Sequence, residues 1–176
     1  MLGLKVQDNA DFGAEIIRRV REHEGLSRVE LARTLGVAAS TIGRHVDSLV
    51  GAAYFTETIE PTKEAGRPPP RLRPNPSRGC FLGIDFHASH VFATAVDFAQ
   101  NELLRMDRPL DGSKGSDAVV EELKRIMREM IAQTKLPVLA AGIAAPGRVD
   151  SRRGAVVEYA YIPGFENVPL AAKLGA

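Results

Sequence analysis

The sequence predicts an α+β protein of two domains, in which three short helices and a β-hairpin precede a partial α/β lobe. Residues 11–50 carry apolar side chains at helical spacing in three successive blocks. From residue 80 onward the pattern changes to short strands around one amphipathic helix at 116–134. Between these patterns, residues 65–76 hold five prolines and three arginines, which is typical of a linker or an extended arm.

Composition sets the broad class of the protein. The chain has 176 residues, of which 44% are apolar and 26% charged, an ordinary globular balance. The net charge of +1 does not by itself indicate that the protein binds nucleic acid. The single cysteine, Cys80, excludes an internal disulfide and a multi-cysteine zinc site. No signal core or long apolar run is present, so we expect a cytoplasmic protein without membrane association.

The first block predicts a domain over residues 1–65. A helix is expected over residues 11–23. Ser27 and Glu30 then form the S-x-x-E pattern of a capping box, which opens a second helix that ends at Gly36. Residues 39–50 give a third helix, although Ala38 stands where a capping side chain is expected.

Two short helices joined by a tight turn and followed by a third helix with a polar outer face are typical of a helix-turn-helix. Small residues at the start of the third helix would let its backbone approach base edges, while Arg44 and His45 project outward. The expected DNA contacts of the helices are Arg28, Ala39, Ser40, Thr41, Arg44 and His45. The alternative is a three-helix bundle with an exposed polar face.

In residues 54–72, apolar and polar side chains alternate for a few residues, after which the chain turns and returns through prolines. This pattern predicts a β-wing and makes the domain a winged helix-turn-helix. Residues 66–78 would form the Pro/Arg wing arm and linker. Arg67, flanked by glycine and proline, suits the narrow minor groove of A·T-rich DNA, and Arg71 would help to anchor the wing. The prolines from Pro69 to Pro76 are expected to act as a stiff spacer.

Residues 79–176 predict the second domain. Its expected elements are a strand hairpin at 80–86 and 90–98, a strand at 102–110, a helix at 116–134, a buried strand at 137–145, a loop at 146–150, a further extended segment at 154–160 and the start of a helix at 168–176. In the long helix, Ser116 is expected to cap the N-terminus. The expected core stripe is Val120, Leu123, Ile126, Met127, Met130 and Ile131.

Four motifs carry a resemblance to a known family: "GRP" at 66–68, "LGID" at 82–85, "GIAAPGRVD" at 142–150 and "PGFENVPL" at 163–170. The chain resembles the N-terminal part of a ROK-family (repressor, open reading frame, kinase) transcriptional regulator. Its second domain is similar to the first lobe of the ribonuclease-H-like, actin-like ATPase and sugar kinase fold.

The resemblance implies a degenerate phosphate loop rather than an enzyme. Kinases of the family carry Asp-x-Gly-x-Thr at the first hairpin. Here Asp85 is kept, whereas His87 replaces the glycine and Ser89 the threonine. The family's catalytic aspartate and zinc motif lie further along the fold than this chain extends. We therefore expect no phosphoryl transfer, no catalytic residue and no cofactor.

Two stretches of the sequence could form small-ligand sites. The resemblance implies that a sugar pocket would be lined by Ala145, Pro146, Gly147, Gly164 and Asn167, although "AAPG" equally fits an ordinary strand-ending turn. His87 and His90 could suggest a metal. On an extended chain their spacing would place the rings on opposite faces, and no third ligand is visible, so no metal site is expected.

The expected function is a DNA-binding transcriptional regulator, a repressor of carbohydrate metabolism genes, with a degenerate kinase-like lobe for sugar sensing or oligomerisation. Expected partners are double-stranded operator DNA, a small sugar or sugar phosphate, and a second copy in a homodimer or higher homo-oligomer. The alternatives are a ROK carbohydrate kinase with an appended helical domain and a pure protein-interaction module. An uncovered sheet face and helix at 168–176 would fit a fragment, a short natural variant or a dimer.

Overall fold

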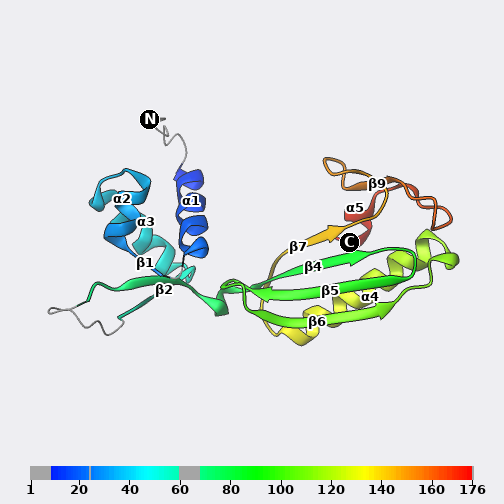
Figure 1. Ribbon diagram of the computed structural model, residues 1–176, viewed down its shortest axis with the longest axis horizontal. Coiled ribbons are helices and arrows are strands. Elements are labelled where there is room, and N and C mark those ends of the chain that lie inside the picture. The colour runs from blue at the N-terminus through cyan, green and yellow to red at the C-terminus, as the bar shows by residue number, and fades with distance from the viewer. Residues whose placement is uncertain (1–8, 24, 60–67, 176) are drawn as a thin grey trace. The chain divides into compact units, whose positions relative to one another are not determined.

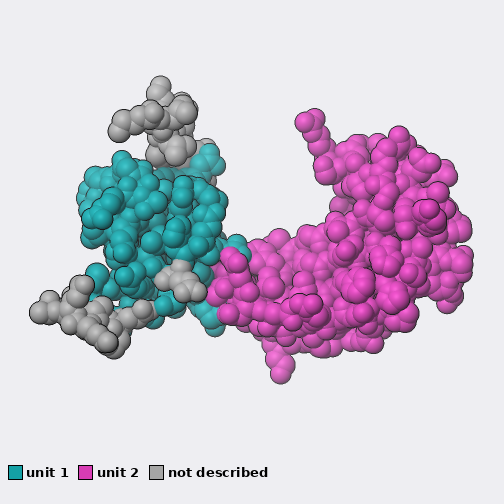
Figure 2. All heavy atoms as spheres, in the orientation of Figure 1, with its two compact units in different colours: residues 1–78 teal, residues 79–176 magenta. Residues whose placement is uncertain are grey.

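The structure is a computed structural model that describes residues 9–23, 25–59 and 68–175. The chain divides into two compact units, residues 1–78 and residues 79–176 (Figure 2). Each unit has its own buried apolar cluster. The two units are therefore described separately.

The described residues of the first unit form three α-helices and a three-stranded antiparallel sheet (Figure 1). Its elements are α1 (Asn9–Glu22), β1 (Leu26–Ser27), α2 (Arg28–Leu35), α3 (Ala39–Gly51), β2 (Phe55–Thr58) and β3 (Arg71–Pro74). The strand order is β1-β3-β2, so the returning strand β3 lies in the centre of the sheet.

The ends of α2 follow the signals in the sequence. The Ser27 hydroxyl accepts a hydrogen bond from the Glu30 amide, and the Glu30 carboxylate accepts one from the Ser27 amide. Gly36 ends the helix in the left-handed region at φ 67°, where glycine is favoured because it lacks a Cβ. Ala38 provides no side-chain cap to α3. These three predictions are confirmed.

The core of the first unit joins all of its elements. Phe12, Ile16 and Val20 on α1 are buried, as the helical spacing predicts. The other buried apolar residues of this cluster are Leu31, Ala32, Ile42, Val46, Phe55 and Leu72. Leu72 belongs to the stretch that was expected to be a polyproline spacer. That expectation is wrong for residues 71–74, because they pair with β2 and β1 as the central strand.

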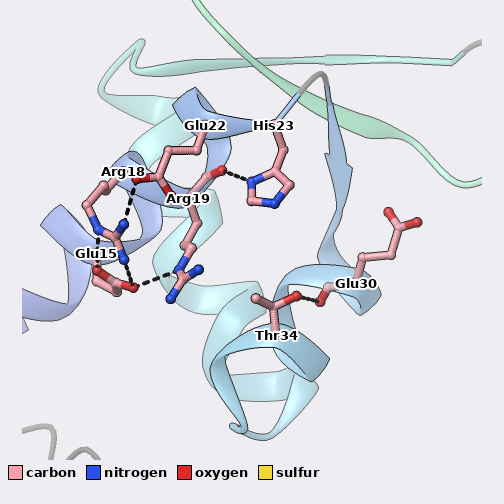
Figure 3. A network of polar contacts seen from close by, with 7 residues as sticks. All are labelled: Glu15, Arg18, Arg19, Glu22, His23, Glu30 and Thr34. Carbon is pink, nitrogen blue, oxygen red and sulfur yellow. Dashed lines mark hydrogen bonds and ion pairs between the residues drawn. The ribbon is translucent and has the colours of Figure 1, made fainter.

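An ion-pair network covers the outer side of α1 (Figure 3). Arg18 donates to both oxygens of Glu15, at 2.7 and 2.9 Å, and to Glu22 at 2.6 Å. Arg19 donates to the same Glu15 carboxylate at 2.8 Å. These hydrogen bonds, first from Arg18 and then from Arg19, lower the pKa of Glu15 to about 2.

We expect Glu15→Gln to lower the stability of the first unit at pH 7 by about 0.5–1 kcal/mol, because exposed helical ion pairs contribute little each. The folded-state pKa of Glu15 lies below the ordinary glutamate value of 4.5, so this stabilisation is present above pH 4.5 and is lost as the pH falls towards about 2. Thermal unfolding of both proteins across that range checks this. If the difference in melting temperature between wild type and Glu15→Gln did not decrease as the pH falls, the stabilising role of the Glu15 ion pairs would be contradicted.

The second unit combines two sheets with two helices. The first sheet has the order β6-β5-β4-β7, and a smaller sheet has the order β10-β9-β8. The elements are β4 (Cys80–Phe86), β5 (His90–Asp97), β6 (Glu102–Pro109), α4 (Ser116–Thr134), β7 (Val138–Ala144), β8 (Arg148–Asp150), β9 (Ala155–Glu158), β10 (Glu166–Val168) and α5 (Leu170–Leu174). The predicted hairpin, third strand and long helix are confirmed. Residues 148–150, expected in a loop, form β8 because they pair with β9.

Helix α4 covers one face of the larger sheet (Figure 1). Its buried residues are Val119, Val120, Leu123, Ile126 and Met130. Two expectations for α4 are wrong. Gly115, rather than Ser116, is its N-cap residue, and Ile131 is 46% exposed because it lies beside the buried stripe.

The burial of α5 and the exposure of β7 in the second unit also differ from the sequence prediction. Helix α5 is not poorly covered, because Leu170 and Leu174 are buried in the same cluster as α4. Strand β7 is not buried: each of its residues is at least partly exposed, since it is an edge strand of the sheet. The sheet face away from α4 has a hollow of about 590 Å³, lined in part by Asp85, Phe92 and Arg105.

Candidate nucleic-acid interface

The outer face of α3 is built from small and polar residues around one arginine. Ile42 and Val46 face the core, which turns Ser40 and Arg44 to the exposed side of the helix. Ala39 is also exposed, and Thr41 and Gly43 are half-exposed. Arg44 has no hydrogen bond or ion pair with any residue that the structure describes. The arrangement leaves a positively charged, hydrogen-bonding side chain exposed among small residues.

His45 does not project as freely as the sequence suggested. Its ring meets Phe12 of α1 edge to face, with ring centroids 4.8 Å apart and an interplanar angle of 80°. The side chain is half-buried as a result. The expected outward projection of His45 is therefore wrong, because an aromatic contact between α1 and α3 holds the ring.

Arg28 lies at the first position of α2 and is held by two carboxylates. Its Nε donates to Glu57 on β2 at 2.8 Å, and its NH1 donates to Asp47 on α3 at 2.6 Å. The hydrogen bond to Glu57, and then that to Asp47, raises the pKa of Arg28. Neither acid stands out in the sequence, because the residues in each pair are far apart along the chain and become neighbours only through the fold.

The structure describes only some of the arginines in and around the expected wing, and Arg71 and Arg78 among them make contacts within the first unit. Arg67 lies outside the described residues. Arg71, at the start of β3, donates to the Gly25 carbonyl at 3.0 Å and lies 3.4 Å from the Glu30 carboxylate. The guanidinium of Arg78 lies over the Tyr54 ring, 4.5 Å from its centroid. Arg71 and Arg78 therefore already make contacts within the first unit.

The residues of the expected degenerate phosphate loop lie at the β4–β5 turn. Asp85 is exposed near the end of β4, and Ser89 Oγ lies 3.4 Å from His87 Nδ1. The rings of His87 and His90 are 6.0 Å apart. The expectation that they point to opposite faces is wrong, because the chain turns between them instead of staying extended. Even so, no group of three or more metal-binding side chains occurs in the described parts of the chain.

The residues of the expected sugar pocket lie around the β10-β9-β8 sheet. Ala145 packs against the core of the second unit, and Pro146 is half-buried. Gly147 and Gly164 both have positive φ, at 80° and 73°, and Asn167 has φ 50° in β10. None of these five residues lines the 590 Å³ hollow.

The substitution Gly147→Ala tests whether the β10-β9-β8 sheet leaves space for a side chain at this position. A Cβ at this position would clash with the Glu158 carbonyl oxygen, and the backbone is left-handed. We expect the second unit to lose at least about 1–2 kcal/mol of unfolding free energy, measured by chemical denaturation. Gly142→Ala is the matched control, because a Cβ there meets nothing within 4 Å. Equal stability of the two variants would contradict this geometry.

Comparison with solved structures defines the class of fold. A ROK-family transcriptional regulator, a homologue of the E. coli MLC protein, matches 93% of this chain with a TM-score of 0.72 at 20% sequence identity. The resemblance to the N-terminal part of such a regulator is thus confirmed at the level of the fold. This chain covers 42% of the regulator's length.

Two further proteins resemble parts of the chain. An uncharacterized protein of Sinorhizobium fredii, y4fQ, is 20% identical over 155 residues, which are 86% of this chain and 39% of that protein. A ROK hexokinase from Thermus thermophilus matches 54% of this chain and 30% of its own length, with a TM-score of 0.47 and 24% identity. No protein-family model matches the sequence. Within the described ranges, no helix has the length and apolar character needed to cross a bilayer.

Proposed function

We propose that residues 1–65 form a winged helix-turn-helix that binds double-stranded DNA in a sequence-dependent manner. Helices α2 and α3 would be the helix-turn-helix, and the β2–β3 hairpin would be the wing. The observation that carries this proposal is the outer face of α3, where Arg44 is exposed among small residues and makes no ion pair within the described part of the chain. Such a face fits the major groove, because small side chains allow close approach and a guanidinium can bond both acceptors of a guanine.

The individual contacts remain proposals. Arg44 would read bases, with Ser40 and Thr41 bonding bases or phosphates beside it. Helix α3 has no side-chain cap, and the Thr41 amide already donates to the Ala38 carbonyl, so the amides of Ala39 and Ser40 would be the ones to bond a phosphate. Arg67 would enter the minor groove beside the site, in A·T-rich sequence.

For the whole protein we propose a transcriptional repressor that acts as a homodimer and responds to a sugar or sugar phosphate. The likeness in fold to a ROK-family transcriptional regulator supports this class. Membership of that family and regulation of carbohydrate genes are part of the same proposal. No catalytic role is proposed for the second unit.

Selection of bound fragments from a random duplex pool tests the proposed function. We expect a motif to be enriched, with A·T-rich flanks, and its spacing would show whether two half-sites are read. Binding of the selected duplex should weaken as salt rises, because phosphate contacts release counterions. Recovery of a pool without any enriched motif would contradict sequence-specific recognition.

A further inference from the structure

The ion pairs of Arg28 place two acidic side chains beside the proposed DNA-binding face. On α3, Asp47 follows Ser40 by seven residues and Arg44 by three, so all three lie on one side of the helix. Asp47 is exposed, with 67% of its side chain accessible. Glu57 extends the acidic charge onto the neighbouring strand β2. A duplex on the Arg44 face would bring its phosphates towards these carboxylates.

Arg28 lies between the two acids. Its Nε and NH1 atoms each donate to a different carboxylate, and only a third of its side chain is accessible. A planar guanidinium can serve two carboxylates at once in this way, whereas an ammonium group is a single point charge. Two of the five N–H donors already serve acids, and the two carboxylates beside the guanidinium repel a phosphate, which argues against the direct phosphate contact expected from the sequence.

We propose that Arg28 is an internal counter-ion that allows Asp47 and Glu57 to lie at a DNA-binding surface. Arg28 thereby acts as a positioning residue. It offsets part of the negative charge that would otherwise repel phosphates, and it joins the start of α2 to both α3 and the β2–β3 hairpin. This inference rests on the proposed DNA binding and assigns a role to residues that the proposed contacts leave unused.

A double-mutant comparison separates a counter-ion from a phosphate contact. Affinity for the selected duplex is measured in the full chain for four proteins: the wild type, Arg28→Gln, the pair Asp47→Asn with Glu57→Gln, and all three changes together. We expect Arg28→Gln alone to weaken binding about tenfold, because two carboxylates lose their partner near phosphates. In the protein that already carries Asp47→Asn and Glu57→Gln, we expect Arg28→Gln to weaken DNA binding by less than about twofold.

The variant Arg28→Lys keeps the charge but replaces two directed donors by a single point charge, so it should weaken binding by about threefold, which is less than the loss from Arg28→Gln. Circular dichroism and melting temperature show whether each variant is folded. An equal loss from Arg28→Gln in both backgrounds would overturn the counter-ion role and restore a direct phosphate contact. Failure of the wild-type chain to bind any duplex would instead overturn the proposed function, and this inference with it.

Discussion

Replacement of Arg44 by alanine is expected to weaken binding to the selected duplex by about tenfold to a hundredfold, the value of one bidentate contact to a guanine. The reason is that Arg44 is exposed on α3 and makes no hydrogen bond or ion pair within the described residues. The side chain can therefore be removed without breaking contacts in the described structure. Fluorescence anisotropy at one fixed salt concentration, with the selected duplex and a scrambled duplex, measures the effect.

The loss from Arg44→Ala should be larger on the selected duplex than on the scrambled one, so that sequence preference is relaxed. Arg128→Ala is the matched control, because it removes the same charge from an exposed position on α4 in the second unit. We expect that control to leave both affinities unchanged within about twofold. An equal loss on both duplexes would mean that Arg44 contributes only a general charge.

The second large effect is expected at the inner face of the same helix. Ile42 is fully buried in the core of the first unit, so Ile42→Ala should lower the free energy of unfolding of that unit by about 2–5 kcal/mol. The loss combines reduced burial of apolar surface with the cavity that remains. Chemical denaturation followed by the helical circular dichroism signal measures it.

Ile59→Ala is the control for that substitution, because the side chain of Ile59 is half exposed. We expect it to change the stability by less than about 0.5 kcal/mol. A similar loss for the two variants would contradict the assignment of Ile42 to the core. DNA binding by Ile42→Ala should fall with the folded fraction, in contrast to Arg44→Ala, which should remain folded.

The parts of the fold that were predictable from sequence depend on local signals. The capping box of Ser27 and Glu30 and the left-handed Gly36 act within a few residues, so their residue types suffice to place both ends of α2. The 3.6-residue spacing of Phe12, Ile16 and Val20 likewise shows one buried face of α1.

The features of the fold that could not be predicted depend on contacts between residues that are distant in sequence. An apolar run such as residues 137–145 reads the same in a central strand and in an edge strand, and only the sheet order shows that β7 is exposed. The sequence assigned residues 71–74 both to the returning side of a wing and to a spacer, and only their pairing with neighbours on both sides shows that they form a central strand. The contacts of Arg28 with Asp47 and Glu57 span three elements, which periodicity does not reveal.

The candidate interface was only partly predictable for the same reason. The exposed side of α3 follows from its buried stripe, so Ser40 and Arg44 could be placed in advance. The edge-to-face contact of His45 with Phe12 links two helices and gives no sign in the sequence. The contacts of Arg71 with Gly25 and Glu30 arise from the pairing of β3 with β1.

Nuclear magnetic resonance of the ¹⁵N-labelled full chain, titrated with the selected duplex, tests most directly whether the α3 face binds DNA. We predict that the largest amide shifts occur at Ser40, Thr41, Gly43 and Arg44, with smaller ones at Asp47. Amides of α4 and β4 should serve as internal references and stay in place. Shifts confined to residues 79–176, or equally large shifts for a scrambled duplex, would contradict sequence-specific recognition by α3.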